Sequence, residues 1–214
     1  MKVRVPVDPT IPVWATLFLV AVVSTLLSLA DVLAFSQETR ELPNFMQEKQ
    51  LKIRDEVPDD AQAIFDLTAA AFEPKAYSDG TEAPIINQLR IDGDLTTSLV
   101  AVADGEVVGH VAFSPVTISG SSDGWYGLGP VSVRTDLQRT GIGSKIIRKG
   151  LSRLEANGAA GCALIGDPDY YGRFGFKSDG RLHYEELPDR LVQWLAFGDE
   201  DAEGVLEFCA AFQS

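Results

Sequence analysis

Apolar side chains recur in regular patterns after residue 50 and predict alternating strands and helices. Helical spacing is found over residues 61–72 and 82–91, and a longer amphipathic helix is expected from Gly141 to Asn157. Asp59 and Gln62 have the spacing of a capping box and are expected to begin the first helix. Short apolar runs predict strands over residues 51–54, 99–103, 107–113, 125–134, 162–165, 191–197 and 205–212. This order favours a single α/β (α+β) domain.

The sequence also identifies the turn of one hairpin. Asp104-Gly105 separates two apolar runs that end at residue 103 and resume at residue 107. Asp-Gly suits a two-residue hairpin turn because both central residues must accept a positive φ. Antiparallel pairing of these two runs is therefore expected.

A different pattern precedes residue 46. Residues 9–30 contain no charged side chain and are almost wholly apolar, which is long enough for a membrane-spanning helix. Lys2 and Arg4 ahead of this run, with small residues after it, are also typical of a secretory signal. A third interpretation is that the natural protein starts at Met46. In each case the apolar segment and linker of residues 1–45 are separate from a domain of residues 46–214.

Composition narrows the functional classes. The 214 residues include 18 Lys+Arg and 31 Asp+Glu, a net charge of −13, and nearly all of it falls after residue 46. An acidic domain is a poor partner for nucleic acid, which requires a basic surface. Cys162, Cys209, His110 and His183 do not have metal-ligand spacing, so no metal site is expected.

Residues 138–144 (QRTGIGS) join a predicted strand to the long predicted helix. Gly141 and Gly143 permit tight turns, and the first N–H groups of a helix lack intrahelical partners at its positive dipole end. The pattern favours a phosphate or diphosphate ligand, although a tight turn with a helix cap has the same pattern. The spacing is not that of a P-loop, and Ile146 stands where a dinucleotide fingerprint has its third glycine.

The spacing Gln138-x-x-Gly141-x-Gly143 resembles the acetyl-CoA loop of the GNAT superfamily of N-acetyltransferases. A second GNAT-like signature follows, in which Tyr171 precedes Gly175-Phe176. Three segments resemble the YhbS-like subgroup in particular: residues 109–115, 128–131 and 166–176. The resemblance covers residues 51 to about 212 and implies a mixed, mostly antiparallel sheet flanked by helices. The N-terminal apolar helix expected from residues 9–30 has no counterpart in the family.

The resemblance also implies the site and the cofactor. Acetyl-CoA is expected as the acetyl donor, with its pantetheine arm along the backbone of Val131, Ser132 and Val133. Its diphosphate is expected on the loop residues Gln138, Arg139, Thr140, Gly141, Ile142, Gly143 and Ser144. Tyr171 matches the position of the family's general acid, and the alternative for Tyr171 is packing beside Phe174 and Phe176.

The general base has no clear signature. His110 titrates in a suitable range, but an ordinary strand histidine fits the same position, and Ser132, Glu73 and Asp94 are weaker candidates. The expected activity is acetyl transfer to a primary amine of a small molecule or peptide. The alternatives are a non-catalytic acyl-CoA-binding module and a membrane-tethered scaffold. A cytoplasmic location, with or without a membrane tether through residues 9–30, follows from the expected use of acetyl-CoA.

Overall fold

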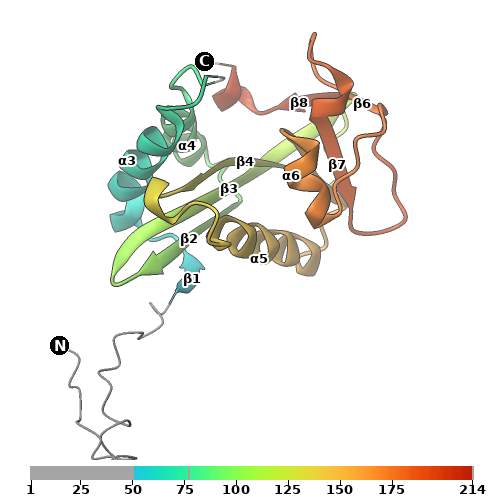
Figure 1. Ribbon diagram of the computed structural model, residues 1–214. Coiled ribbons are helices and arrows are strands. Elements are labelled where there is room, and N and C mark those ends of the chain that lie inside the picture. Colours follow the sequence, from blue (N-terminus) through green and yellow to red (C-terminus); the bar gives the residue numbers. More distant parts are fainter. Residues whose placement is uncertain (1–50, 77, 214) are drawn as a thin grey trace, which may run out of the picture. The chain divides into compact units, whose positions relative to one another are not determined.

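The structure is a computed structural model that describes residues 51–76 and 78–213 (Figure 1). The expected apolar helix of residues 9–30 and the expected division at residue 45 lie outside the described residues. Within the described part, no helix is both long and apolar enough to cross a membrane.

A twisted sheet forms the centre of the domain (Figure 1). Neighbouring strands are antiparallel, except for two parallel pairs: β4 (Trp125–Val133) with β5 (Gly161–Ile165), and β6 (Leu182–His183) with β8 (Gly204–Phe208). The order across the sheet is β1 (Lys52–Asp55), β2 (Thr97–Ala103), β3 (Glu106–Ile118), β4 (Trp125–Val133), β5 (Gly161–Ile165) and β7 (Val192–Ala196). The far end of β3 pairs with β8 (Gly204–Phe208), which also pairs with the short β6 (Leu182–His183).

Helices cover both faces of this sheet (Figure 1). Ile64 of α3 (Ala61–Phe72) and Ile86 of α4 (Glu82–Asp92) pack against Val100 and Ala112 on one face. On the other face, α5 (Ile142–Ala156) packs through four buried residues: Ile146, Ile147, Leu151 and Leu154. The short α6 (Pro168–Tyr171) and a 3₁₀ turn (Gly172–Phe174) follow β5. The expected mixed, mostly antiparallel sheet flanked by helices is confirmed.

Three predicted details are wrong at the ends of elements. The residue that organises the start of α3 is Asp60 and not Asp59, because the Asp60 carboxylate accepts the Val57 N–H at 2.8 Å and pairs with Arg54 at 2.9 Å. The last strand ends at Phe208, and residues 210–212 form a 3₁₀ turn. Strand β3 extends five residues beyond the predicted end at residue 113, because its last residues pair with β8.

Gly150 brings α5 close to the sheet, and a side chain there is expected to destabilise the fold. A Cβ atom on Gly150 would lie 2.2 Å from Cε2 of the buried Phe113 ring. Overpacking costs about 1–3 kcal/mol, and replacing a helical glycine recovers about 1 kcal/mol. We therefore expect Gly150→Ala to lower the free energy of unfolding by up to about 2 kcal/mol in urea titrations. Lys149→Ala, on the exposed side of the helix, is the control and should change it by less than about 0.5 kcal/mol.

Candidate active site

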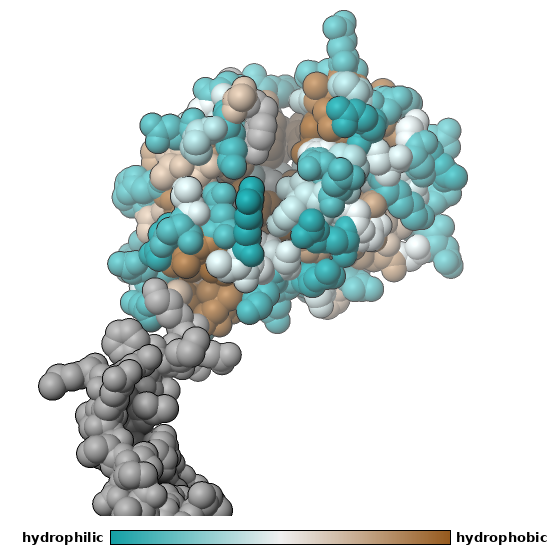
Figure 2. All heavy atoms as spheres, viewed as in Figure 1, coloured by the Kyte–Doolittle hydropathy of each residue, from teal (hydrophilic) through white to brown (hydrophobic). Residues whose placement is uncertain are grey.

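Strands β4 and β5 separate in the middle of the sheet. They pair only at their first residues, from Trp125 opposite Gly161 to Gly127 opposite Ala163, although β4 continues to Val133. Between Leu128 and Val131, β4 contains one more residue than the facing part of β3, which is a β-bulge that bends the strand. In the same region, Figure 2 shows the surface hollowed between the part that carries α3 and α4 and the part that carries α6.

Beyond the last β5 pairing, two residues of β4 direct their backbone groups to the opening. The Arg134 N–H donates to the Val108 carbonyl of β3 at 2.9 Å, and bonding residues alternate along an antiparallel ladder. Ser132, opposite His110, therefore also bonds to β3, whereas the N–H and C=O of Val131 and Val133 point away from it. The Gln138 side-chain amide donates to the Val133 carbonyl at 3.1 Å, which agrees with this direction.

Ser132 thus differs from its two neighbours. Its side chain is 1% exposed and lies 3.0 Å from the Thr68 hydroxyl of α3. Because its backbone bonds to β3, Ser132 offers the opening neither its amide nor its hydroxyl. Of the three β4 residues expected along the pantetheine arm, the structure brings Val131 and Val133 to the opening and leaves Ser132 behind the strand.

The loop that follows β4 concentrates backbone donors at the start of α5. Arg139 has a φ of 64° and Gly141 a φ of 92°, so two left-handed residues bend the chain into the helix. The Thr140 hydroxyl donates to the Leu137 carbonyl at 2.7 Å, and the first helical bond runs from the Lys145 N–H to the Gly141 carbonyl at 3.0 Å. The preceding N–H groups, those of Ile142, Gly143 and Ser144, have no intrahelical acceptor, which makes this turn suitable for an anion.

Tyr170 and Tyr171 approach this loop from the β5 side. A Cβ atom on Gly143 would lie 3.2 Å from the Tyr170 hydroxyl and 3.5 Å from Val133. The Tyr170 side chain of α6 therefore contacts the first turn of α5 at a residue that has no side chain. The Tyr171 ring lies against Gly166, where a Cβ atom would be 2.5 Å from it, and its centroid is 4.9 Å from that of Tyr170. The structure therefore places Tyr171 in a ring cluster beside the loop.

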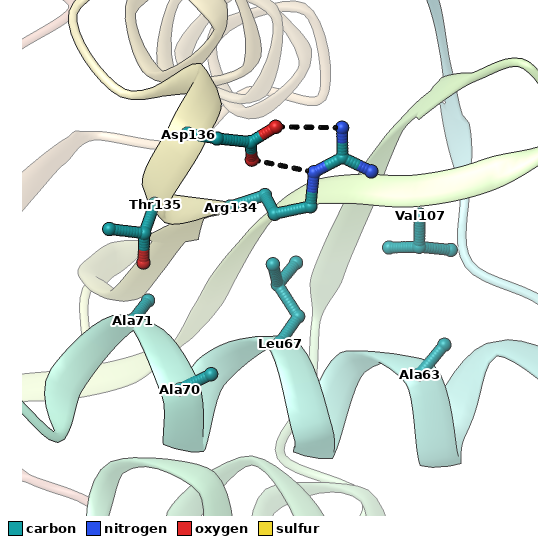
Figure 3. A pocket seen from close by; sticks show the side chains of 8 residues that line it. All are labelled: Ala63, Leu67, Ala70, Ala71, Val107, Arg134, Thr135 and Asp136. Carbon is teal, nitrogen blue, oxygen red and sulfur yellow. Dashed lines mark hydrogen bonds and ion pairs between the residues drawn. The ribbon is translucent and has the colours of Figure 1, made fainter.

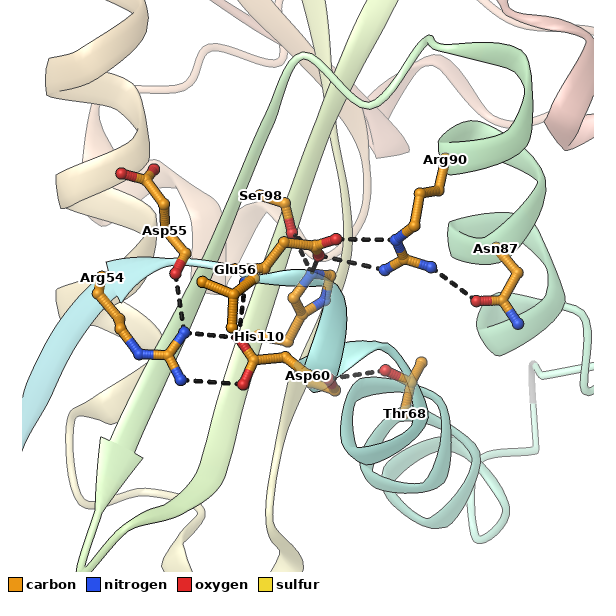
Figure 4. A network of polar contacts seen from close by, with 11 residues as sticks. Arg54, Asp55, Glu56, Asp60, Thr68, Asn87, Arg90, Ser98 and His110 are labelled. Carbon is orange, nitrogen blue, oxygen red and sulfur yellow. Dashed lines mark hydrogen bonds and ion pairs between the residues drawn. The ribbon is translucent and has the colours of Figure 1, made fainter.

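A buried polar network lies on the α3 and α4 face of the sheet (Figure 4). Arg90 of α4 donates to both Glu56 carboxylate oxygens, at 2.8 and 3.1 Å, and the Ser98 hydroxyl donates to the same carboxylate. His110 Nε2 lies 2.8 Å from Ser98 Oγ. Because the single Ser98 proton is used on Glu56, Nε2 of His110 carries the proton, and its Nδ1 is a bare acceptor without a partner among the described residues.

His110 is fully buried, so it does not reach a substrate directly. Burial lowers the pKa of His110 below its usual range, and the Glu56 carboxylate opposes this shift from 3.7 Å. Burial alone would raise the pKa of Glu56, but polar contacts with His110, Arg90 and Ser98 outweigh it and lower that pKa to about 2. The sequence carries no signal for this network, because Glu56, Ser98 and Arg90 have ordinary sequence surroundings.

The network predicts a loss of stability in mild acid. A histidine with a lowered pKa stabilises the fold above its unfolded value, near 6.5, and this contribution is lost as the pH falls below that value. Glu56, whose pKa is also lowered in the folded protein, adds a further loss of stability as the pH falls below about 4.5. We expect the free energy of unfolding to fall by up to about 1.4 kcal/mol per pH unit below pH 6.5. His110→Gln should flatten this slope in urea titrations between pH 7 and 5, and an unchanged slope would contradict the assignment.

A separate pocket of about 390 Å³ lies between α3 and the end of β4 (Figure 3). Its α3 wall is apolar and contains Leu67 and three alanines. Arg134 at its rim is ion-paired with Asp136 at 2.8 Å and with Glu106 at 3.0 Å. Because two carboxylates neutralise this arginine, the pocket is less suited to a phosphate than the donor-rich turn of residues 138–144.

Comparison with known proteins assigns the family. Residues 52–178 match the GNAT acetyltransferase domain. The chain is 40% identical over 126 residues to YhbS of Escherichia coli, an uncharacterised N-acetyltransferase, and the match covers 58% of this chain and 72% of that protein. The uncharacterised N-acetyltransferase YjhQ of the same organism is 31% identical over 109 residues, which are 49% of this chain and 60% of YjhQ.

Solved structures agree with this assignment. A GNAT family acetyltransferase from Brucella melitensis, crystallised with acetyl-CoA, is 49% identical with a TM-score of 0.70, over 77% of this chain and 99% of that chain. The structure of Escherichia coli YhbS with CoA is 33% identical with a TM-score of 0.71, over 77% and 92% of the two chains. The resemblance inferred from residues 109–176 is confirmed: the chain belongs to the GNAT family of N-acetyltransferases, close to its YhbS-like members.

Proposed function

We propose that the domain transfers an acetyl group from acetyl-CoA to a primary amine of a small molecule or peptide. The observation that carries the proposal is the junction of two features, an open edge on β4 and a donor-rich turn at the start of α5. An extended arm pairs with an open strand edge, and a diphosphate suits a helix N-terminus. The relatives crystallised with acetyl-CoA and CoA support this choice of donor.

In the proposed geometry, the diphosphate binds the amides of residues 141–144, and the pantetheine amides pair with Val131 and Val133. Arg139 adds a positive charge at the exposed side of the loop. Gln138 holds the Val133 carbonyl and so fixes the strand end that the arm must follow. Ser132 contributes indirectly, because its bonds to β3 and Thr68 keep β4 in place.

The reaction needs no protein nucleophile. The unprotonated amine attacks the thioester carbonyl, a C–N bond forms, and the C–S bond breaks with the electron pair leaving on sulfur. A β4 amide facing the opening, that of Val131 or Val133, stabilises the oxyanion that forms on the carbonyl oxygen. Tyr171 donates its proton to the departing thiolate. The proton lost by the amine passes to solvent, and solvent returns a proton to the Tyr171 phenolate.

The same site can bind acyl-CoA without turnover, and one experiment separates the two functions. A panel of primary amines and lysine-containing peptides is incubated with protein and acetyl-CoA, and free CoA thiol and acetylated amine are measured. Equal amounts of thiol and acetylated product support the transferase. Tight calorimetric binding of acetyl-CoA without any acetylated amine would instead assign a non-catalytic acyl-CoA-binding module.

We also propose that the domain works in the cytoplasm, where acetyl-CoA is available. A tether through residues 9–30 is compatible with this only if the domain faces the cytoplasm. Mass spectrometry of the N-terminus of the native protein distinguishes a retained apolar segment from a start at Met46. Detection of the domain outside the cytoplasm would contradict the proposal.

A further inference from the structure

One arginine lies beside the start of α5 but outside the loop described above. Arg173 is in the 3₁₀ turn after α6, with its guanidinium carbon 4.7 Å from the centroid of the Tyr170 ring. The hydroxyl of that ring lies against Gly143, the second helical residue of α5. A single aromatic ring therefore separates the Arg173 guanidinium from the turn that is proposed to bind the diphosphate.

The backbone that carries Arg173 is tied to α5. Arg148 of α5 donates through Nη2 to the Arg173 carbonyl at 3.1 Å. The Arg148 guanidinium carbon also lies 5.0 Å from the centroid of the buried Phe174 ring, which holds the turn on its other side. The position of Arg173 relative to the start of α5 is thus fixed by a helix, a hydrogen bond and two aromatic contacts.

The charge of Arg173 is not neutralised by the described part of the chain. Within residues 51–76 and 78–213, neither Arg173 nor Arg148 forms an ion pair with a carboxylate. Five other arginines do so: Arg54, Arg90, Arg134, Arg153 and Arg181. The Asp167 carboxylate, at the start of α6, accepts the Asp169 N–H at 3.0 Å as a helix cap. In a chain of net charge −13, an unpaired guanidinium at this place attracts an anionic ligand.

We propose that Arg173 binds the 3′-phosphate of the acyl-CoA donor. The inference rests on the proposed function, because that phosphate lies one ribose away from the diphosphate. A guanidinium matches phosphate oxygens with two parallel hydrogen bonds, and its flat face can remain stacked on Tyr170. The contact selects free acyl-CoA as donor over an acyl group on the phosphopantetheine arm of a carrier protein, which has no 3′-phosphate.

The test compares acetyl-CoA with 3′-dephospho-acetyl-CoA in calorimetric titrations of the full chain. The wild type is expected to bind acetyl-CoA about tenfold more tightly, a difference of about 1.4 kcal/mol. Arg173→Ala should abolish most of this difference in affinity, because only the binding of acetyl-CoA is weakened. Arg173→Lys should retain part of the difference because the positive charge remains. Arg181→Ala, which removes an arginine paired with Asp201, is the control and should leave the difference unchanged.

Two results would overturn the inference. Equal binding of the two donors by the wild type would show that the 3′-phosphate is not recognised. An equal loss of affinity for both donors in Arg173→Ala would mean that the arginine only supports Tyr170. If the wild type bound neither donor, the proposed function itself would fail and the inference with it. That outcome is distinct from the first two, in which acetyl-CoA still binds.

Discussion

Gly141→Glu is expected to weaken acetyl-CoA binding by at least about 100-fold, through like-charge repulsion and backbone strain together. Gly141 has a φ of 92° at the N-cap of α5, and a left-handed conformation costs other residues about 1–2 kcal/mol. The new carboxylate would also stand beside the turn proposed to hold the diphosphate. Calorimetric titration with acetyl-CoA measures the loss.

Two controls separate charge from strain in this prediction. Gly141→Ala introduces the strained backbone without the carboxylate and should weaken binding by no more than about tenfold. Gly158→Glu makes the same change just beyond the other end of α5, at a glycine with a φ of 80° and no neighbour within 4 Å of the new Cβ. It should leave binding unchanged. Full retention of acetyl-CoA affinity in Gly141→Glu would place the diphosphate elsewhere.

Tyr171→Phe is expected to lower kcat by about 100-fold or more, because general acid catalysis contributes about 10²–10⁴-fold. The ring should stay in place, since its contacts with Gly166, Tyr170 and Phe176 do not involve the hydroxyl. The KM for acetyl-CoA should therefore change little. Steady-state thiol release with a saturating amine measures both constants.

The competing role for Tyr171 is packing, and the same kinetics distinguish it. If Tyr171 only supports the ring cluster, the variant should keep its kcat, or lose acetyl-CoA affinity and stability together. Tyr184→Phe removes a hydroxyl from a ring that packs on Phe208, away from the loop, and should behave as the wild type. A variant Tyr171→Phe with normal kcat would contradict the general-acid role.

Local patterns were sufficient for the elements whose signals lie within a few residues. The 3.6-residue apolar stripe predicts α5, Asp104-Gly105 predicts the hairpin of β2 and β3, and Gly141 takes the left-handed conformation that its position requires. In each case the chain contacts itself over a short distance, or a single backbone angle decides the conformation.

Features that depend on non-local contacts could not be predicted from the sequence. The extension of β3 depends on pairing with β8, about 90 residues later, and the two-residue β6 is held by the same strand. The network of Glu56, Ser98 and His110 forms only when three strands pair in the observed register. The backbone of Ser132 bonds to β3, whereas the backbone groups of Val131 and Val133 point away from it. This difference depends on the register of β4 against β3, for which the sequence carries no signal.

Residue-resolved amide hydrogen exchange reports whether acetyl-CoA pairs with the open edge of β4 and binds at the start of α5. Exchange is measured by NMR with and without saturating acetyl-CoA. Bound acetyl-CoA is expected to give new protection at Val131, Val133 and Ile142–Ser144, with little change at Ser132, whose amide already bonds to β3. Unchanged exchange at Val131, Val133 and the first turn of α5, with new protection around Leu67 and the Arg134 pocket, would contradict this mode of binding.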